Sequence, residues 1–311
     1  MHTKTKGYLL GAIASATYGM SPLFTLPLYR DGMGPDSVLL FRYLFAILIV
    51  GVLLLARGHN LKVERRQLLP LAIMGLLMAL SSLCLFESFN HMAAGLACTI
   101  LFVYPIMVAT LMALFFKERI PWQTALCILL ALCGIGLLYD SSDGSQISLS
   151  GSLLALGSAL AYAIYIVGVN RPLFKELPTL KLTFYVLLFG AVLFLFRLDF
   201  GTAIRTPEHG YHWLNLVALA LFPTAISFFC TTAAIQYIGS TPTAILGALE
   251  PLTALFFGWA LFHERLTLRE WSGVVIILLS VTLVIAGREL PTLLMRLRKM
   301  FPSIRQTDKK S

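Results

Sequence analysis

A stretch of sixteen residues occurs twice in this chain, and this repetition constrains the fold more than any other feature. Residues 104–119 read YPIMVATLMALFFKER and residues 250–265 read EPLTALFFGWALFHER, aligned without a gap at an offset of 146. Each copy carries a proline within a long apolar run and ends that run with a Glu-Arg pair. Long-period repetition indicates a duplicated architecture, and two strongly apolar copies indicate a membrane protein built from structural repeats.

The composition also indicates a membrane protein. The 311 residues are 58% hydrophobic and only 13% charged, and the mean hydropathy is +0.82. Soluble domains carry about a quarter charged residues, so this chain has too few charges to cover a water-exposed surface. The cysteines lie in apolar runs without metal-binding spacing, so we interpret them as buried apolar residues and predict neither a disulfide framework nor a metal site.

Ten apolar runs of about 20 residues can be counted, and each is long enough to cross a bilayer as a helix. They lie near residues 7–27, 37–56, 70–89, 93–116, 121–139, 151–169, 179–197, 213–237, 240–262 and 270–287. We interpret the first run as a retained helix and not as a signal peptide. The reason is that its opening residues Gly7-Tyr8-Leu9-Leu10 have a counterpart in Gly151-Ser152-Leu153-Leu154.

The distribution of Lys and Arg between the loops predicts the orientation. With the N-terminus inside, 18 of these residues fall in cytoplasmic segments and five in outer segments, while Arg42 stays within a helix. This asymmetry places both termini in the cytoplasm and explains the net charge of +9 without a nucleic-acid partner. Because five spans per repeat is an odd number, the second repeat must enter the membrane in the opposite direction.

We therefore predict an all-α polytopic membrane protein, with ten transmembrane helices arranged as two inverted five-helix repeats. The predicted boundaries are a first repeat over 1–139, an outer linker over 140–150, a second repeat over 151–287 and a basic cytoplasmic tail over 288–311.

Small residues recur at every fourth position in the first helix of each predicted repeat. They are Gly7, Gly11, Ser15 and Gly19 in one, and Gly151, Ala155, Ala159 and Ala163 in the other. Such stripes let helices approach closely in lipid. We interpret both helices as lining the interface between the halves, and an ordinary packing seam is the alternative.

Matching prolines are expected to break two of the predicted helices. Pro105 and Pro251 each remove a helical hydrogen bond and free a carbonyl group near the middle of the membrane. Helices broken at matching positions of two halves are a strong sequence indication of a transporter's binding site.

Glu250 directly precedes the second of these prolines, close to the predicted bilayer midplane. A carboxylate at that depth costs roughly 3 kcal/mol and should face a cavity or a partner. Its counterpart in the first repeat is Tyr104, so the duplication itself does not require the charge. Two interpretations stay open: a proton carrier, or a neutral hydrogen-bonded residue that stabilises the kink.

A second charged group within the predicted spans is Arg42, whose depth matches that of Glu87. The two could form a structural ion pair, or Arg42 could snorkel outward or anchor an anionic group of the substrate. Four tyrosines at mid-depth offer aromatic faces and hydroxyl groups, for packing or for substrate contact: Tyr18, Tyr104, Tyr162 and Tyr165.

Sequence motifs of common enzymes are absent. The chain contains no HExxH, GxSxG or P-loop pattern, so we predict no enzyme, no catalytic residue and no cofactor. Transport driven directly by ATP would need a nucleotide-binding domain, and the sequence shows no motif of one.

Several of these features together resemble a known family. They are the ten runs, the two Pro…Glu-Arg segments 105–119 and 251–265, Phe41-Arg42, and Glu250-Pro251. In these features the chain is similar to EamA-domain transporters of the drug/metabolite transporter superfamily, over roughly residues 7–287. One departure is Tyr18-Gly19, where many members carry Trp-Gly. The resemblance implies a secondary carrier, usually an exporter of amino acids or other small metabolites, with inverted-repeat helices around a central cavity that opens to alternate sides.

The predicted function is export of a small metabolite, amino-acid-like or another small organic solute, by alternating access in a bacterial inner membrane. Proton coupling is left open. An uncoupled importer or facilitator is the alternative within transport, and a non-transporting membrane scaffold or sensor is the alternative outside it. The expected partners are a small-molecule substrate and the lipid bilayer, without nucleic acid, and protons and a homodimer are left open.

Overall fold

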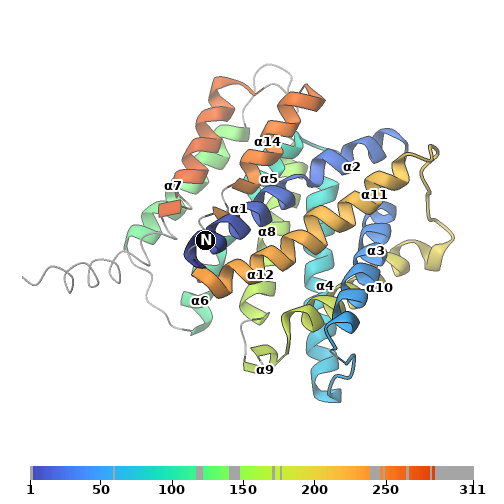
Figure 1. The fold of residues 1–311 in the computed structure, drawn as a ribbon. Coiled ribbons are helices and arrows are strands. Elements are labelled where there is room, and N and C mark those ends of the chain that lie inside the picture. Colours follow the sequence, from blue (N-terminus) through green and yellow to red (C-terminus); the bar gives the residue numbers. More distant parts are fainter. Residues whose placement is uncertain are drawn as a thin grey trace, which may run out of the picture.

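The computed structural model describes residues 3–58, 60–116, 122–139, 148–169, 172–175, 177–238, 246–247, 249–263, 266–280 and 282–283. Within these residues every regular element is a helix, so the prediction of an all-α fold is confirmed (Figure 1). Both Glu-Arg pairs, linker residues 140–147 and the tail 288–311 lie outside the described residues.

The helices of the first half follow the predicted runs. They are α1 (Thr3–Gly19), α2 (Ser21–Arg30), α3 (Pro35–Ala56), α4 (Arg65–Ser88), α5 (Ala94–Leu101), α6 (Tyr104–Phe116) and α7 (Trp122–Tyr139). Local signals set where they begin: α3 starts with Pro35, which needs no hydrogen-bonded N–H there. The helix α4 starts with a capping box between Glu64 and Gln67.

The second half contains α-helices together with a 3₁₀ turn and a π-helix. They are α8 (Leu149–Val169), α9 (Pro172–Lys175), α10 (Thr179–Arg197), a 3₁₀ turn (Asp199–Gly201), α11 (His212–Ala220), a π-helix (Leu221–Ile226), α12 (Ser227–Ile238) and α14 (Leu249–Phe262). Residues 268–280 are also helical.

Seven helical segments are long and apolar enough to cross a membrane, judged on the described residues alone. They are Thr5–Arg30, Pro35–Ala56, Arg65–Ser88, Ala94–Phe115, Leu149–Val169, Leu180–Arg197 and His212–Thr231. These segments correspond to seven of the ten predicted runs, so the chain is a multi-pass membrane protein. The other three runs contain α7, α14 and the helix over 268–280, and the count of ten spans stays a prediction.

Three of the seven spans are interrupted. The first changes from α1 to α2 at Met20, and the fourth is broken at residues 102–103, directly before Tyr104 and Pro105. The seventh contains the π-helix, in which Pro223 lies, between α11 and α12. Prolines and π-helical turns are the usual causes of such breaks. A break near Pro105 is among the helix breaks expected from the sequence, whereas those at Met20 and at the π-helix are not.

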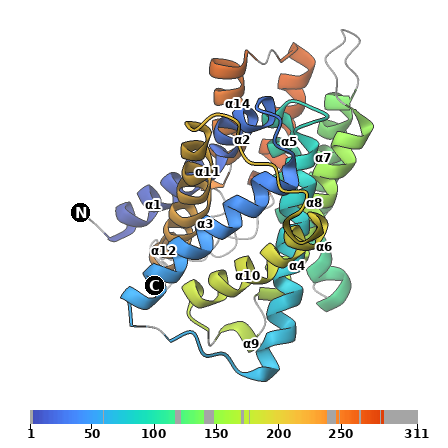
Figure 2. The same cartoon turned by 90° about the vertical axis from the view of Figure 1, so that its right-hand side faces the viewer.

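The first helix of each half packs mainly on the other half. The helix α1 contacts α12 and α14, whereas α8 contacts α4, α5 and α6. Figures 1 and 2 show α1 running beside α12 in both views. The small-residue stripes lie in these contacts: added Cβ atoms at Gly7 and Gly11 would lie 2.6 Å from side chains of Ile238 and Leu246, respectively. The stripes therefore lie between the halves, as the sequence analysis expected.

Candidate substrate pathway

The carboxyl-bearing residue Glu250 lies in the first turn of α14, where the chain resumes its helix. Its backbone N–H donates to Gly247 O at 3.0 Å, and Pro251 follows at a position where a helix needs no N–H donor. The positive end of the helix dipole stabilises a carboxylate there by about 0.3–1 kcal/mol. Glu250 is half-buried as a residue, and no side chain among the described residues forms a hydrogen bond or ion pair with its carboxylate.

Glu250 faces tyrosines from both halves of the chain. It lies within electrostatic range of Tyr18 near the end of α1, Tyr104 at the start of α6 and Tyr162 on α8. All three tyrosines are partly exposed, although they lie in the middle of their spans. Four of the predicted site residues therefore lie near one another, three of them at helix ends and Tyr162 within α8.

The aromatic rings continue this group along α8. The Tyr104 and Tyr162 rings meet edge to face with centroids 4.8 Å apart, and Tyr165 stacks on Tyr162 at 6.0 Å. Edge-to-face and offset arrangements of this kind are the favourable ones for aromatic pairs. Tyr165 thus extends the row and lies one ring further from Tyr104.

The helices α1 and α14 approach each other closely at Gly19. A Cβ atom placed on Gly19 would lie 2.3 Å from the backbone carbonyl oxygen of Glu250, which leaves no room for any other residue. The glycine thus lets the backbones of the two halves touch next to the candidate carboxylate. Tyr18, where the family pattern carries Trp, directly precedes this contact.

The guanidinium group of Arg42 is buried on α3, with a relative exposure of 3% for the residue. Its Nε donates to Thr224 Oγ1 at 3.0 Å, and its charge lies over the Phe86 ring at 5.2 Å from the centroid. Thr224 belongs to the π-helix, whose wider turn thus presents a hydroxyl group to the arginine. Arg42 and Glu250 both lie within electrostatic range of Tyr18.

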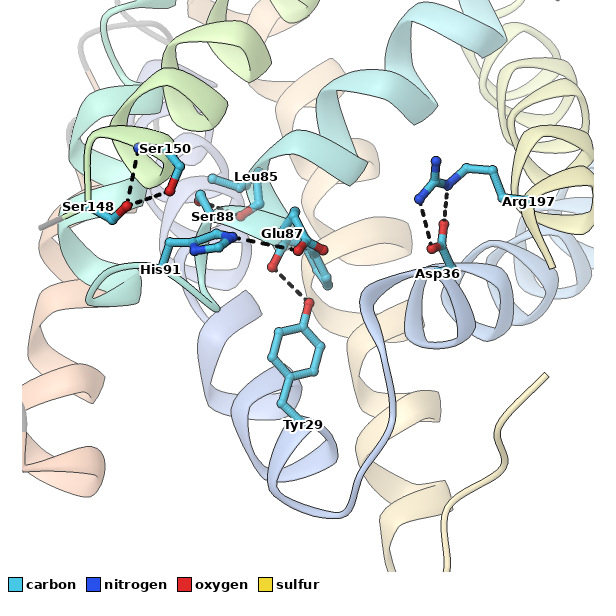
Figure 3. Close-up of polar contacts among 10 residues, drawn as sticks. Tyr29, Asp36, Leu85, Glu87, Ser88, His91, Ser148, Ser150 and Arg197 are labelled. Atoms are coloured by element: carbon cyan, nitrogen blue, oxygen red, sulfur yellow. Dashed lines mark hydrogen bonds and ion pairs between the residues drawn. The ribbon is translucent and has the colours of Figure 1, made fainter. Parts of the chain in front are cut away.

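The alternative in which Arg42 pairs with Glu87 is wrong for the arrangement that the structure describes. Near the end of α4, Glu87 Oε1 lies 3.8 Å from His91 Nε2 (Figure 3). The described ion pairs of Glu87 do not include Arg42. The two residues have similar depth, but the rotation of α4 turns Phe86 toward the guanidinium group and Glu87 toward the helix end. Arg42 does not snorkel outward either, because it is buried.

Sequence reasoning missed two residues of this arrangement. Thr224 and Phe86 contact Arg42 directly, yet both occur in apolar runs without a motif. Pro223 was the available signal, because a proline within a predicted span often accompanies a local change of helical geometry.

Interrupted membrane helices that converge on charged groups are characteristic of secondary transporters. Comparison with known proteins agrees with this class. The model of the EamA-like transporter family matches twice, over residues 5–140 and 149–286. The chain belongs to this family, so it is a transporter and not an enzyme.

Individual relatives support the same assignment. An uncharacterized transporter of Archaeoglobus fulgidus is 31% identical over 225 residues, which cover 72% of this chain and 77% of the relative. The uncharacterized inner membrane transporter YicL of Salmonella typhimurium is 27% identical over 292 residues, 91% of this chain and 96% of the relative. A protein of known crystal structure, 20% identical, shares the fold with a TM-score of 0.64 over 94% of this chain and 98% of that chain.

Proposed function

We propose that this transporter is a proton-coupled secondary carrier that exports an amino-acid-like solute across a bacterial inner membrane by alternating access. The observation that carries the proposal is the convergence of Glu250 with tyrosines of both halves at the interrupted helices. The name of the Salmonella relative and the predicted excess of Lys and Arg on the inner side support an inner-membrane location.

The charges around Tyr18 favour a solute that has both an anionic and a cationic group. A buried guanidinium group without a carboxylate partner is costly, and an anionic group of the substrate would lower that cost. Glu250 offers the complementary carboxylate for an amino group. The tyrosine row provides aromatic faces for an apolar side chain or for the cation itself.

Proton coupling needs one ionisable group that is exposed to each side of the membrane in turn. Glu250 satisfies the chemical part of this requirement because its carboxylate has no fixed cationic partner among the described residues. Exposure to alternate sides also requires that the surroundings of Glu250 change during transport, and its position at the backbone contact with Gly19 supports this. A relative movement of the two halves would change the surroundings of the carboxylate directly.

Transport in proteoliposomes tests the proposal. Counterflow of radiolabelled amino acids identifies a substrate, and everted membrane vesicles with an acidified lumen should then accumulate it. Glu250→Gln keeps the shape of the side chain but removes its titration. This variant should bind substrate less tightly, because the amide offers no charge to the amino group, but should still exchange it at saturating concentration. It should fail to accumulate substrate in response to the pH gradient.

The matched control is Glu208→Gln, because the Glu208 side chain is exposed in the loop before α11. This control should accumulate substrate like the wild type. A Glu250→Gln variant with unchanged pH-driven accumulation would contradict the coupling role. Wild-type counterflow without any response to the pH gradient would favour an uncoupled facilitator, and absence of counterflow for every solute would favour a scaffold or sensor.

A further inference from the structure

Three metal-binding side chains meet at one end of the bundle, outside the substrate pathway. Asp31 directly follows α2, while His209 lies in the loop before α11 and His212 is the first residue of α11. One ligand atom from each residue lies within 4.8 Å of the other two. The Nδ1 atoms of His209 and His212 each lie 2.6 Å from a carboxylate oxygen of Asp31, namely Oδ1 and Oδ2.

The surrounding structure holds the carboxylate in place. The Asp31 side chain has an exposed fraction of only 4%, and its Oδ2 accepts backbone N–H groups of Glu208 at 2.9 Å and His209 at 3.4 Å. These bonds fix the loop 208–209 to the end of α2. The cluster is therefore a built arrangement and not a chance meeting of mobile surface groups.

The Nδ1 atom of His212 is the least well satisfied donor or acceptor of the cluster. The His212 side chain has an exposed fraction of 8%, and its Nδ1 makes no aligned hydrogen bond within the described residues. Its 2.6 Å contact is with Asp31 Oδ2, the oxygen that also accepts the backbone N–H groups of Glu208 and His209. Buried polar atoms normally have a partner, and a metal ion bound between the imidazole and the carboxylate would supply one.

The donor set selects the kind of ion. Two imidazole nitrogens and one carboxylate oxygen are the ligands of many three-residue zinc sites, which leave a fourth position open. Ca²⁺ and Mg²⁺ instead prefer sites made of oxygen atoms. His209 has an exposed fraction of 58%, so an ion and its water ligand can reach the cluster from solvent.

We propose that Asp31, His209 and His212 bind a Zn²⁺ ion. Asp31 comes from the first half of the chain and the two histidines come from the second, with α2 packed against α11 beside them. A bound ion thus ties the halves together at this end. If the proposed alternating access is right, Zn²⁺ slows transport by holding this end in one arrangement; this second step alone rests on the proposed function.

Direct titration with ZnCl₂ tests the site without reference to transport. Purified protein, with any affinity tag removed, is titrated by calorimetry in the presence of a competing chelator. We expect one Zn²⁺ per chain. His209→Asn should weaken binding by about 100-fold or more, since even the loss of a group that only orients a ligand costs about 10- to 100-fold.

The matched control is His91→Asn, which removes a histidine that lies beside a single carboxylate, Glu87. This control should bind Zn²⁺ as tightly as the wild type. Because His209 is exposed, its variant should fold normally, and an unchanged melting temperature in chelator verifies this. Added Zn²⁺ should raise the melting temperature of the wild type and the control but not that of His209→Asn.

Two results would overturn the site. One is the absence of Zn²⁺ binding to the wild type, which would leave the cluster as a hydrogen-bonded link between α2 and the loop. The other is equal affinity of the wild type and His209→Asn. Binding that depends on His209 without any effect on transport would keep the site and reject only its influence on the carrier.

Discussion

Replacing Gly19 by alanine tests the backbone contact between α1 and α14 most directly. The new Cβ atom would lie 2.3 Å from Glu250 O and 2.8 Å from the Cβ atom of Thr253. Real Cβ atoms essentially never approach other atoms more closely than 3.0 Å. Because the nearest atom belongs to the backbone, no side-chain rotation can relieve the clash, and the helices must separate by about 0.7 Å or more.

The expected cost follows from this enforced separation. Adding a methyl group to a tightly packed site costs about 1–3 kcal/mol. The gain in helix propensity from Gly to Ala reaches about 1 kcal/mol within a helix interior, but Gly19 is the last residue of α1 and gains less. We therefore expect the free energy of unfolding to fall by about 1–2 kcal/mol.

A matched control is available in α8. An added Cβ atom at Gly157 meets no atom within 4 Å, so Gly157→Ala should leave the free energy of unfolding unchanged or raise it slightly. Equilibrium unfolding in mixed micelles measures both variants. Equal stability of Gly19→Ala and Gly157→Ala would refute the close contact, and so would a Gly19→Ala variant as stable as the wild type.

Three further predictions concern other parts of the molecule. Arg42→Gln should weaken binding of an anionic substrate by about 10- to 100-fold, the loss expected for a charged hydrogen bond, and Arg42→Lys should weaken it less; equal losses would argue against a charge contact. In a double-mutant cycle, Ser81→Ala and Ser158→Ala should show a coupling of about 0.6 kcal/mol in unfolding, because the two Oγ atoms form a hydrogen bond between α4 and α8 at 3.1 Å; strict additivity would contradict that role. Reporter fusions should place Glu208 outside and Glu64 inside, and the same side for both would overturn the predicted orientation.

The sequence predicts the helices of this fold well because their apolar runs are long. The residues that interrupt them, such as proline, act on their own stretch of the chain. Pro105 marks an interruption directly, and the four-residue spacing of small residues identifies α1 and α8 as closely packed. Both signals act through neighbouring residues in the chain. The family assignment follows from the same local features, because they recur in both halves.

The rotation of each helix about its axis could not be predicted. A helix that is apolar all round carries no hydrophobic stripe to fix its orientation, so the depth of Glu87 suggested a partner that it does not contact. The π-helix at Thr224 has no motif of its own. Asp31 and His209 are 178 residues apart, and only the packing of α2 on α11 brings them together.

The first helix of each half, α1 or α8, packs mainly on helices of the other half. This arrangement has a consequence for the biosynthesis of the protein. Ser227 Oγ donates to Ala14 O at 2.9 Å across 213 residues of sequence, so α1 leaves the ribosome long before its main neighbour exists. While the intervening helices are synthesised, the glycine-lined face of α1 stays unpacked in the membrane or the translocon. Such non-local closure slows folding and exposes surfaces that can mispair. Biogenesis should therefore depend on insertion factors that shield α1, and a ribosome stalled before α12 should leave Gly7 and Gly11 open to cross-linking with them.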